Sequence, residues 1–305
     1  MSWVCPLCST ANLDTEQKCM VCDAKNPSSS FDSVLAQAEY DRVTKKEEYE
    51  SGLKAYKAKD YTTAYSLFLS SAQKGYPPAE NALGDCYFYG IGVTLDYKEA
   101  FSWYQKAAGH GNVNAQYAMG YCYNYGKGVE KSMIFAVKWY NTAAQKGNAS
   151  AKNALANCYY YGNEVGQNYN TAFKYFLESA NAGNTAAMYN TGLCYTLGKG
   201  VAVDYAKALE YYLKCEKLGY SLAYNALGDC YFYGRGVEVD FTTAAKYYKK
   251  GADRNIAVSQ YNLGYCYEYG KGVVRNIAVA KKWYENAANQ GYEAAKKVLK
   301  RLSGV

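Results

Sequence analysis

Small and apolar residues return at a fixed interval of 36 residues over most of this chain. Counted from a recurring cysteine, positions −7, −3, 0 and +1 hold such residues or tyrosine, and these positions share one face of an α-helix. A glycine at +4 predicts the end of that helix, because glycine readily adopts the left-handed backbone of a C-cap. In the first copy the core positions are Ala79, Leu83, Cys86 and Tyr87, and the recurring cysteines are Cys86, Cys122, Cys158, Cys194, Cys230 and Cys266.

A second helix is predicted in the remainder of each interval. It carries an alanine followed by two bulky aromatic residues, as in Ala100, Trp103 and Tyr104. A small residue two positions before each cysteine, such as Gly84, lets the bulky side chains approach closely. The predicted fold class is therefore all-α, an α/α superhelical solenoid of helix-turn-helix repeats.

The predicted array covers residues 38–303. Its third full unit has Glu164 where the other full units have a second loop glycine, so a different bend is expected there. The closing helix carries Lys296, Lys297, Lys300 and Arg301, as a polar end cap requires. The predicted units are a short one at 38–77, full ones at 78–112, 113–148, 149–184, 185–220, 221–256 and 257–292, and the closing helix at 293–303.

The amino-terminal residues form a separate motif with two Cys-x2-Cys pairs ten residues apart. Two such pairs place four thiolates around one ion, the tetrahedral ligand set that zinc prefers. We therefore predict a four-cysteine zinc finger at residues 1–27, followed by a flexible linker at 28–37 that is rich in small polar residues. The predicted Zn²⁺ ligands are Cys5, Cys8, Cys19 and Cys22.

Composition and charge narrow the classes of function. The net charge of +7 is spread among charges of both signs, without the basic stripe expected of a nucleic-acid surface. No apolar run is long enough to span a bilayer, and the first residues lack the regions of a signal peptide. We therefore expect a cytoplasmic or nuclear location without membrane attachment, where the repeat cysteines are buried small hydrophobic residues and not disulfides.

Candidate catalytic groups are few. His110 is the only histidine, and its counterparts in other units are Lys, Ala, Leu, Arg and Gln, a set typical of an exposed helix end. Cys215 occupies a column of Ala, Ser and Gly, which favours a packed small residue over a reactive thiol. The Gly-x-Gly loops lack the strand and the Lys-Ser/Thr of a phosphate-binding loop. No enzyme activity and no small-molecule substrate are predicted.

Two resemblances to known families follow from these motifs. The array, about residues 38–303, resembles the Sel-one-like (Sel1-like) repeats of the tetratricopeptide superfamily, which implies a mostly non-catalytic scaffold. The amino-terminal motif resembles the zinc finger of the Ran-binding-protein (nucleoporin) type, which has branches that bind single-stranded RNA or ubiquitin. The motifs are Ala79, Leu83-Gly84, Tyr89-Gly90, Gly92-Val93, Ala100, Trp103-Tyr104, Ala107-Ala108 and Gly111 in one repeat, and Trp3-x-Cys5-x2-Cys8-x3-Asn12-x6-Cys19-x2-Cys22 in the finger.

The resemblance to tetratricopeptide-like arrays places positions −5, −1 and +2 of each first helix on a concave groove. These columns vary along the chain, as a binding surface should. Asn amides can bond to a peptide backbone or terminal carboxylate, and Tyr rings supply rigid contact area. At −5 the predicted protein-binding residues alternate between Asn and Tyr: Asn81, Tyr117, Asn153, Tyr189, Asn225 and Tyr261.

The sequence thus predicts a non-enzymatic adaptor that binds a protein or peptide in the groove, with the zinc finger as a second binding module. The alternative is binding of single-stranded RNA or ubiquitin through the finger. The arginines of the RNA-binding branch are replaced here by the mixed residues 13–18, and the Thr-Phe pair of the ubiquitin-binding branch by Ser9-Thr10. For groove residues, the competing interpretation is that the Asn and Tyr side chains bind neighbouring helices.

Overall fold

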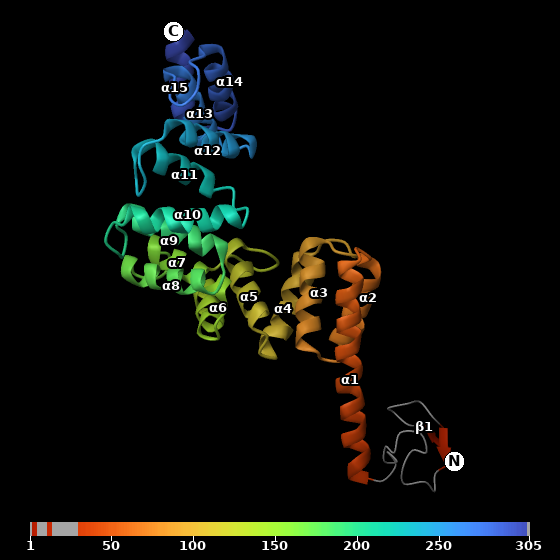
Figure 1. Cartoon of the computed structure of the whole chain (residues 1–305). Coiled ribbons are helices and arrows are strands. Elements are labelled where there is room, and N and C mark those ends of the chain that lie inside the picture. Colours follow the sequence, from red (N-terminus) through yellow and green to blue (C-terminus); the bar gives the residue numbers. More distant parts are fainter. Residues whose placement is uncertain (1, 5–10, 14–29, 304–305) are drawn as a thin grey trace. The chain divides into compact units, whose positions relative to one another are not determined.

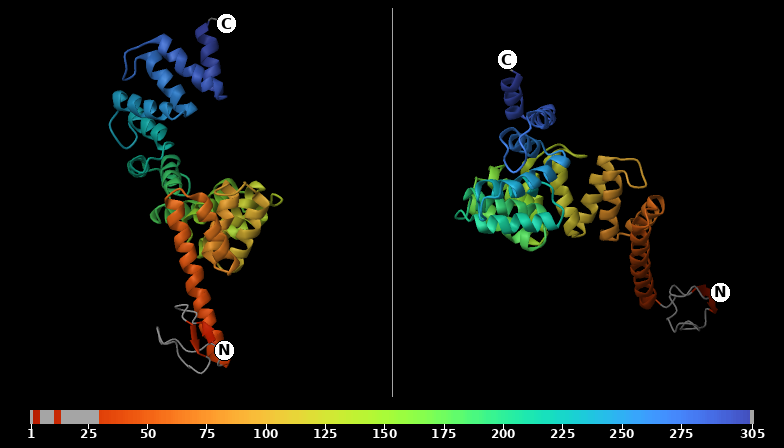
Figure 2. Two further views of the ribbon diagram at one scale, coloured as in Figure 1. Left: turned by 90° about the vertical axis from the view of Figure 1, so that its right-hand side faces the viewer. Right: turned by 45° about the horizontal axis from the view of Figure 1, so that its top comes forward.

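The computed structural model describes residues 2–4, 11–13 and 30–303, with side chains from residue 43 onward. These residues form fifteen α-helices and two short strands (Figure 1, Figure 2). The chain divides into two compact units, Met1–Lys146 and Gly147–Val305. Within each unit, every helix packs on the next helix in the sequence. The described array is therefore all-helical, as the sequence predicts.

The first unit contains six helices. The predicted linker at 28–37 is wrong from Ser30 onward, because α1 begins there and continues through the start of the array. The polar composition that suggested a tether does not prevent a helix, since Ser and Asp also favour helix amino-termini. The helices are α1 (Ser30–Lys57), α2 (Tyr61–Gln73), α3 (Pro77–Tyr89), α4 (Tyr97–Gly109), α5 (Val113–Tyr125) and α6 (Met133–Gln145).

The second unit continues the same alternation of first and second helices. Its last helix, α15, presents exposed Lys296, Lys297 and Lys300 to solvent. The helices are α7 (Ala149–Tyr161), α8 (Tyr169–Asn181), α9 (Thr185–Leu197), α10 (Tyr205–Lys217), α11 (Ala223–Tyr233), α12 (Phe241–Asp253), α13 (Ala257–Tyr269), α14 (Ile277–Asn289) and α15 (Glu293–Ser303). Among the described helices, none is both long and apolar enough to cross a membrane.

The amino-terminal strands, β1 (Ser2–Val4) and β2 (Ala11–Leu13), form an antiparallel pair in which Trp3 lies opposite Asn12. They flank residues 5–10, which include the first cysteine pair. The predicted zinc ligands Cys5, Cys8, Cys19 and Cys22 lie outside the described residues.

Local chemistry explains why each helix begins and ends where it does. The second helix α4 is capped by Asp96, whose side chain accepts hydrogen bonds from the backbone N–H groups of Lys98 and Glu99. The first helix α3 ends at Gly90, which has a left-handed backbone with φ of 69°. Polar N-caps recur on the other second helices at Asp60, Ser132, Asn168, Asp204, Asp240 and Asn276.

The predicted core face of the first helices is buried. In α3, Ala79, Leu83 and Cys86 are at most 1% exposed, and Tyr87 is half-buried. Gly84 allows the second helix to pack against this face, because a Cβ there would lie 2.6 Å from the ring of Tyr104. The same close approach recurs at Gly120, Gly192, Gly228 and Gly264, whereas the third full unit pairs Ala156 with Phe176.

In five of the six full units, the loop after the first helix returns to the second helix of the preceding repeat. Gly128 has φ of 73°, and a Cβ there would lie 1.9 Å from the carbonyl oxygen of Tyr97. The neighbouring Lys127 ammonium lies 4.3 Å from the centre of the Tyr97 ring, a cation–π contact. Glu164 adopts the same left-handed backbone, with φ of 55°, so the predicted change in bend is wrong at this residue.

Candidate functional site

One side of the first helices collects the variable positions. We call positions −5, −1, +2 and +3, counted from each repeat cysteine, the groove face. The six residues predicted at −5 are all half-buried, neither in the core nor fully in solvent. Their contacts show which of them line a pocket and which bind neighbouring helices.

The three asparagines make hydrogen bonds within the array. Asn81 donates to Asp85 Oδ2 at 3.2 Å, one turn further along α3. Asn153 accepts a hydrogen bond from Asn190 at 3.1 Å, across neighbouring first helices. Asn225 donates to Asp229 Oδ2 at 3.2 Å and also accepts from Asn262 at 2.9 Å. These internal hydrogen bonds therefore occupy some of the amide donors and acceptors that the sequence analysis assigned to a ligand.

The three tyrosines pack against the buried aromatic residue of their own repeat's second helix. Ring centres lie 5.8 Å apart for Tyr117 and Tyr140, and 5.8 Å apart for Tyr189 and Tyr212. Tyr261 lies 5.4 Å from the ring of Tyr284 and 5.2 Å from that of Tyr292. These rings are therefore held by packing within the array and are only partly exposed to a partner.

The largest described pocket on the groove face lies at the start of the array. It has a volume of about 450 Å³ and is lined by residues of α1, α2, α3 and α5 and of the loop after α3. We call it the Asp85 pocket, because Asp85 is the one charged residue among its described lining residues. The predicted residue Asn81 lies in its wall. The other lining residues are Tyr49, Leu53, Tyr56, Phe68, Ala82, Cys86, Tyr89, Ile91 and Asn114.

Asp85 is oriented by two hydrogen bonds. The hydroxyl of Tyr104, itself only 2% exposed, donates to Oδ1 at 2.7 Å, and the Asn81 amide donates to Oδ2. Burial raises the pKa of Asp85, and the Tyr104 hydrogen bond opposes that rise. Burial and the neighbouring Asp85 charge also raise the pKa of Tyr104. The pocket thus presents a fixed carboxylate in an environment that disfavours an uncompensated charge.

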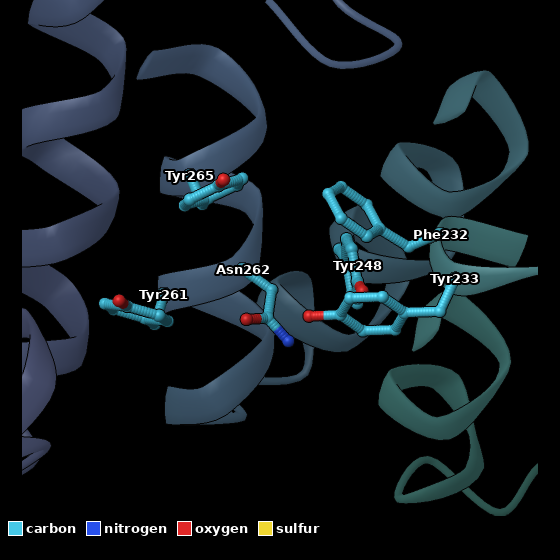
Figure 3. Close-up of a pocket in the computed structure, with 6 residues that line it drawn as sticks. All are labelled: Phe232, Tyr233, Tyr248, Tyr261, Asn262 and Tyr265. Carbon is cyan, nitrogen blue, oxygen red and sulfur yellow. The ribbon is translucent and has the colours of Figure 1, made fainter. Parts of the chain in front are cut away.

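A second pocket, of about 230 Å³, lies near the end of the array between α11, α12 and α13 (Figure 3). We call it the Tyr233 pocket. Figure 3 shows the hydroxyl of Tyr233 on α11 pointing toward the Asn262 amide on α13. The predicted residue Tyr261 lies in its wall, and the remaining lining residues are Phe232, Tyr248 and Tyr265. A smaller pocket, of about 50 Å³, lies on the same face among α7, α8 and α9.

Sequence reasoning missed the most exposed aromatic residues of this face. Position +3 holds tyrosine in all but one full repeat, directly before the glycine that ends the first helix. Tyr89 in the Asp85 pocket is 66% exposed, and Tyr233 in the other pocket is 59% exposed. Helical periodicity could have identified these tyrosines, because position +3 lies about one turn after position −1 on the same face. The column consists of Tyr89, Tyr125, Tyr161, Leu197, Tyr233 and Tyr269.

The residues with nucleophilic or ligating potential are placed as structural groups. His110 ends α4 with an exposed side chain, as expected, and its Nδ1 lies 2.8 Å from Oε2 of the buried Glu80. Cys215 is fully buried, as predicted from its column. The repeat cysteines are free and buried, and burial raises the pKa of Cys86 to about 12. In the part of the chain with described side chains, no three His, Cys, Asp or Glu residues gather into a metal site.

The groove face can therefore bind through aromatic rings, amides and an oriented carboxylate. Within each unit, the described pockets lie between successive first helices. Tyrosine, phenylalanine and asparagine are residues that contact peptides with rigid rings and adaptable hydrogen bonds. The arrangement is suited to an extended peptide or a protein surface.

Comparison with known proteins agrees with this architecture. The chain is similar to a protective antigen of uropathogenic Escherichia coli with an SLR fold, at 31% identity and a TM-score of 0.71 over 88% of this chain. It spans 58% of the length of that protein. It is also similar to a Sel1 repeat protein from Oxalobacter formigenes, at 31% identity and a TM-score of 0.72, covering 79% of this chain and 96% of that protein. A search of curated proteins gave no match.

The family profile described as Sel1 repeat matches most of the array. The matched stretches follow one another without a gap from residue 47 to residue 292. They are residues 47–76, 77–112, 113–148, 149–184, 185–220, 221–256 and 257–292. The first match begins nine residues after the start expected from the sequence, inside the long helix α1. With seven consecutive repeats of this kind, the chain belongs to the Sel1 repeat family and is a helical repeat scaffold.

Proposed function

We propose that this protein is a non-enzymatic adaptor whose groove face binds an extended segment of a partner protein. The observation that carries the proposal is the Asp85 pocket, where apolar, amide and carboxylate groups meet in one opening of about 450 Å³. The Tyr233 pocket gives a second contact of the same character. Within the second unit, the Tyr233 pocket and the smaller pocket among α7, α8 and α9 follow one another along the solenoid, which suits an extended partner better than a single compact ligand.

Exposed tyrosines support the same proposal. Tyr89 is 66% exposed although its ring is apolar over most of its area, and it lies beside a pocket that it lines. Aromatic residues at a rim of this kind supply large contact area at a low cost in conformational entropy. Their repetition at +3 is not required by the core, which is formed by other positions.

Site-specific crosslinking and capture test this proposal. A photoreactive phenylalanine analogue at Tyr89 should crosslink a partner from cell extract, and Tyr89→Ala should reduce capture of that partner at least about tenfold, the loss typical of a central aromatic contact. Ile134 on α6 is the matched control, because it is also 66% exposed but lies off the groove face. The same partners crosslinked from both positions, or capture unaffected by Tyr89→Ala, would reject the groove face as the binding surface.

We further propose that the amino-terminal cysteines hold one zinc ion as a second binding module. Four thiolates in two Cys-x2-Cys pairs match the ligand set of a structural zinc site, where the metal fixes the fold and leaves no position for chemistry. The β1–β2 pair supports the proposal, because its strands flank the first cysteine pair. Ubiquitin resin and single-stranded RNA test its partner: chelator-sensitive binding to ubiquitin, or salt-sensitive binding to RNA, assigns the branch. Binding to neither rejects both branches.

A further inference from the structure

The closing helix shows how the groove face holds a cation. Arg301 on α15 donates one hydrogen bond to the Tyr269 hydroxyl at 3.0 Å and another to Glu268 Oε1. The other oxygen of Glu268 accepts from the hydroxyl of Tyr284, a fully buried residue of α14, at 2.8 Å. One guanidinium is thus bound by a carboxylate and by the exposed tyrosine beside it. A buried tyrosine orients the carboxylate.

The same three groups occur in the Asp85 pocket. Tyr104 and Tyr89 stand at the repeat positions of the buried and the exposed tyrosine just described. Asp85 takes the place of the glutamate, although it stands one helical turn earlier in its repeat, on the same face. Its carboxylate accepts a hydrogen bond from the Tyr104 hydroxyl at 2.7 Å. The first repeat of this kind therefore has the parts of a guanidinium site.

Asp85 differs from Glu268, which pairs with Arg301, in having no ion pair with a lysine or arginine among the described residues. In the equivalent repeat of the second unit, burial raises the pKa of Asp229, while the Tyr248 hydrogen bond and the charge of Arg235 oppose that rise. The residue that corresponds to Arg235 in the first unit is Ile91, which lines the Asp85 pocket. The cation is thus replaced by an apolar side chain, and space is left beside the carboxylate.

We propose that the Asp85 pocket binds an arginine side chain of the partner protein, with its guanidinium on the Asp85 carboxylate. This inference rests on the proposed function and names what the partner must carry. A guanidinium would offset the cost of the half-buried carboxylate, because a buried charge is costly unless it is paired. The pocket has no other described charge, so the complementarity is specific to a cation.

Arginine fits this pocket better than lysine or a nucleic acid. Tyr56 and Tyr89 line the pocket, and these residues are 42% and 66% exposed. A planar guanidinium can stack on such rings while it donates two parallel hydrogen bonds to a carboxylate, whereas an ammonium is a compact point charge. A phosphate backbone would be repelled by Asp85, so RNA is not the occupant that we propose.

Ligand-observed NMR on the full chain tests the inference with small probes. N-acetyl-arginine amide should bind at least about tenfold more tightly than its citrulline counterpart, which has the same shape without the charge. Asp85→Asn should remove this preference, since the amide oxygen still accepts from Tyr104 but carries no charge. Glu130→Gln removes an exposed carboxylate elsewhere in the first unit and should leave the preference unchanged.

Other outcomes decide against the proposal. Equal binding of the arginine and citrulline probes, or a preference that survives in Asp85→Asn, overturns it. If Asp85→Asn fails to fold by circular dichroism, Tyr89→Phe provides the test, because it removes only the exposed hydroxyl and should weaken arginine binding severalfold. Partner capture that depends on Tyr89 without any arginine preference would sustain the adaptor function and reject the guanidinium site alone.

Discussion

The buried tyrosine of each second helix finds its polar partner at one of two positions on the first helix. Where −1 is aspartate, the hydroxyl donates there, as from Tyr248 to Asp229 at 2.7 Å. Where −1 is tyrosine or leucine, the partner stands at +2, one turn later, as Thr196 does for Tyr212 at 2.9 Å. The third full unit has Phe176 at this position, which has no hydroxyl to pair. Each buried hydroxyl is thereby satisfied, as protein interiors require.

The carboxylate at −1 makes a testable contribution to stability. Because burial raises the pKa of Asp85, its stabilising effect is fully present below the pKa of an unfolded aspartate and is lost as the pH rises through the folded pKa. Asp85→Asn cannot ionise, so it should gain stability relative to the wild type between about pH 4 and about pH 7. Urea denaturation across this range measures the difference. A difference in stability between the two proteins that does not change with pH would show that burial does not disfavour the charged carboxylate.

Asp240 provides a control of opposite sign. It caps α12, and hydrogen bonds from the Thr243 side chain and backbone lower its pKa. Its stabilising effect is therefore present above the unfolded pKa and is lost as the pH falls through the folded one. The stability of Asp240→Asn relative to the wild type should fall as the pH rises, opposite to the trend for Asp85→Asn. The same trend in both variants would contradict the assignment.

Some residue contacts follow from the sequence and others do not. The burial of Cys86 and Cys215 follows from periodicity, because one side of a helix faces the core in every repeat. The bond between His110 and buried Glu80 does not, since these residues are 30 positions apart and occur together in only one repeat. The same two columns are hydrogen-bonded again in the last full unit, from Gln290 to Gln260 at 2.7 Å, but the residue types differ, so the sequence does not reveal the pairing.

At the scale of elements, the loop after each first helix fixes how successive repeats stack. In five of the six full units the second glycine of this loop lies against the backbone of the preceding second helix. In four of these units the residue before that glycine places a cation over the first aromatic ring of the same helix. Lys199 over Tyr169 and Lys271 over Phe241 repeat the contact at 4.4 and 4.6 Å. Neighbouring repeats are thus joined by backbone contact and by cation–π attraction.

Replacing one of these glycines should therefore cost more than its backbone conformation alone. Gly272 has φ of 71°, and a Cβ there would lie 1.9 Å from the carbonyl oxygen of Phe241. We expect Gly272→Ala to lower the free energy of unfolding by about 3 kcal/mol or more, from the left-handed backbone and the clash together. Gly291→Ala is the control, because Gly291 has φ of 86° with no atom near its Cβ. It should cost only about 1 to 2 kcal/mol, and an equal loss in both variants would contradict the stacking role.

The element boundaries could be predicted closely within the array and poorly before it. Capping residues such as Asp96 and Gly90 recur in register, so each helix end is indicated several times. The start of α1 at Ser30 has no repeat to support it, and the small polar residues around it are typical of a linker. At Glu164 the sequence predicted a change in the loop that does not occur. The surrounding loop imposes the left-handed backbone there, although glutamate rarely adopts it.

At the scale of the whole molecule, periodicity predicts the helical scaffold but does not predict where its pockets lie or how large they are. Pocket size depends on where repeats differ, such as Ile91 in the position of Arg235 and Ala118 in that of Asn262. Such differences stand out in the sequence, but a single column does not show how much space is left beside it. The groove face could therefore be anticipated, whereas the two main pockets required the structure.

Thiol chemistry separates the array from the amino-terminal module in one experiment. Seven of the eleven cysteines are free and buried in the array, and burial raises the pKa of Cys122 to about 12 and that of Cys215 to about 11. Because the thiolate is the reactive form, these seven should react with Ellman's reagent only after denaturation. If zinc holds the other four, they should be protected in the native protein and react when a chelator is added. Four thiols that react without chelator would reject the zinc site, and more than four after chelation would show that the array is open to solvent.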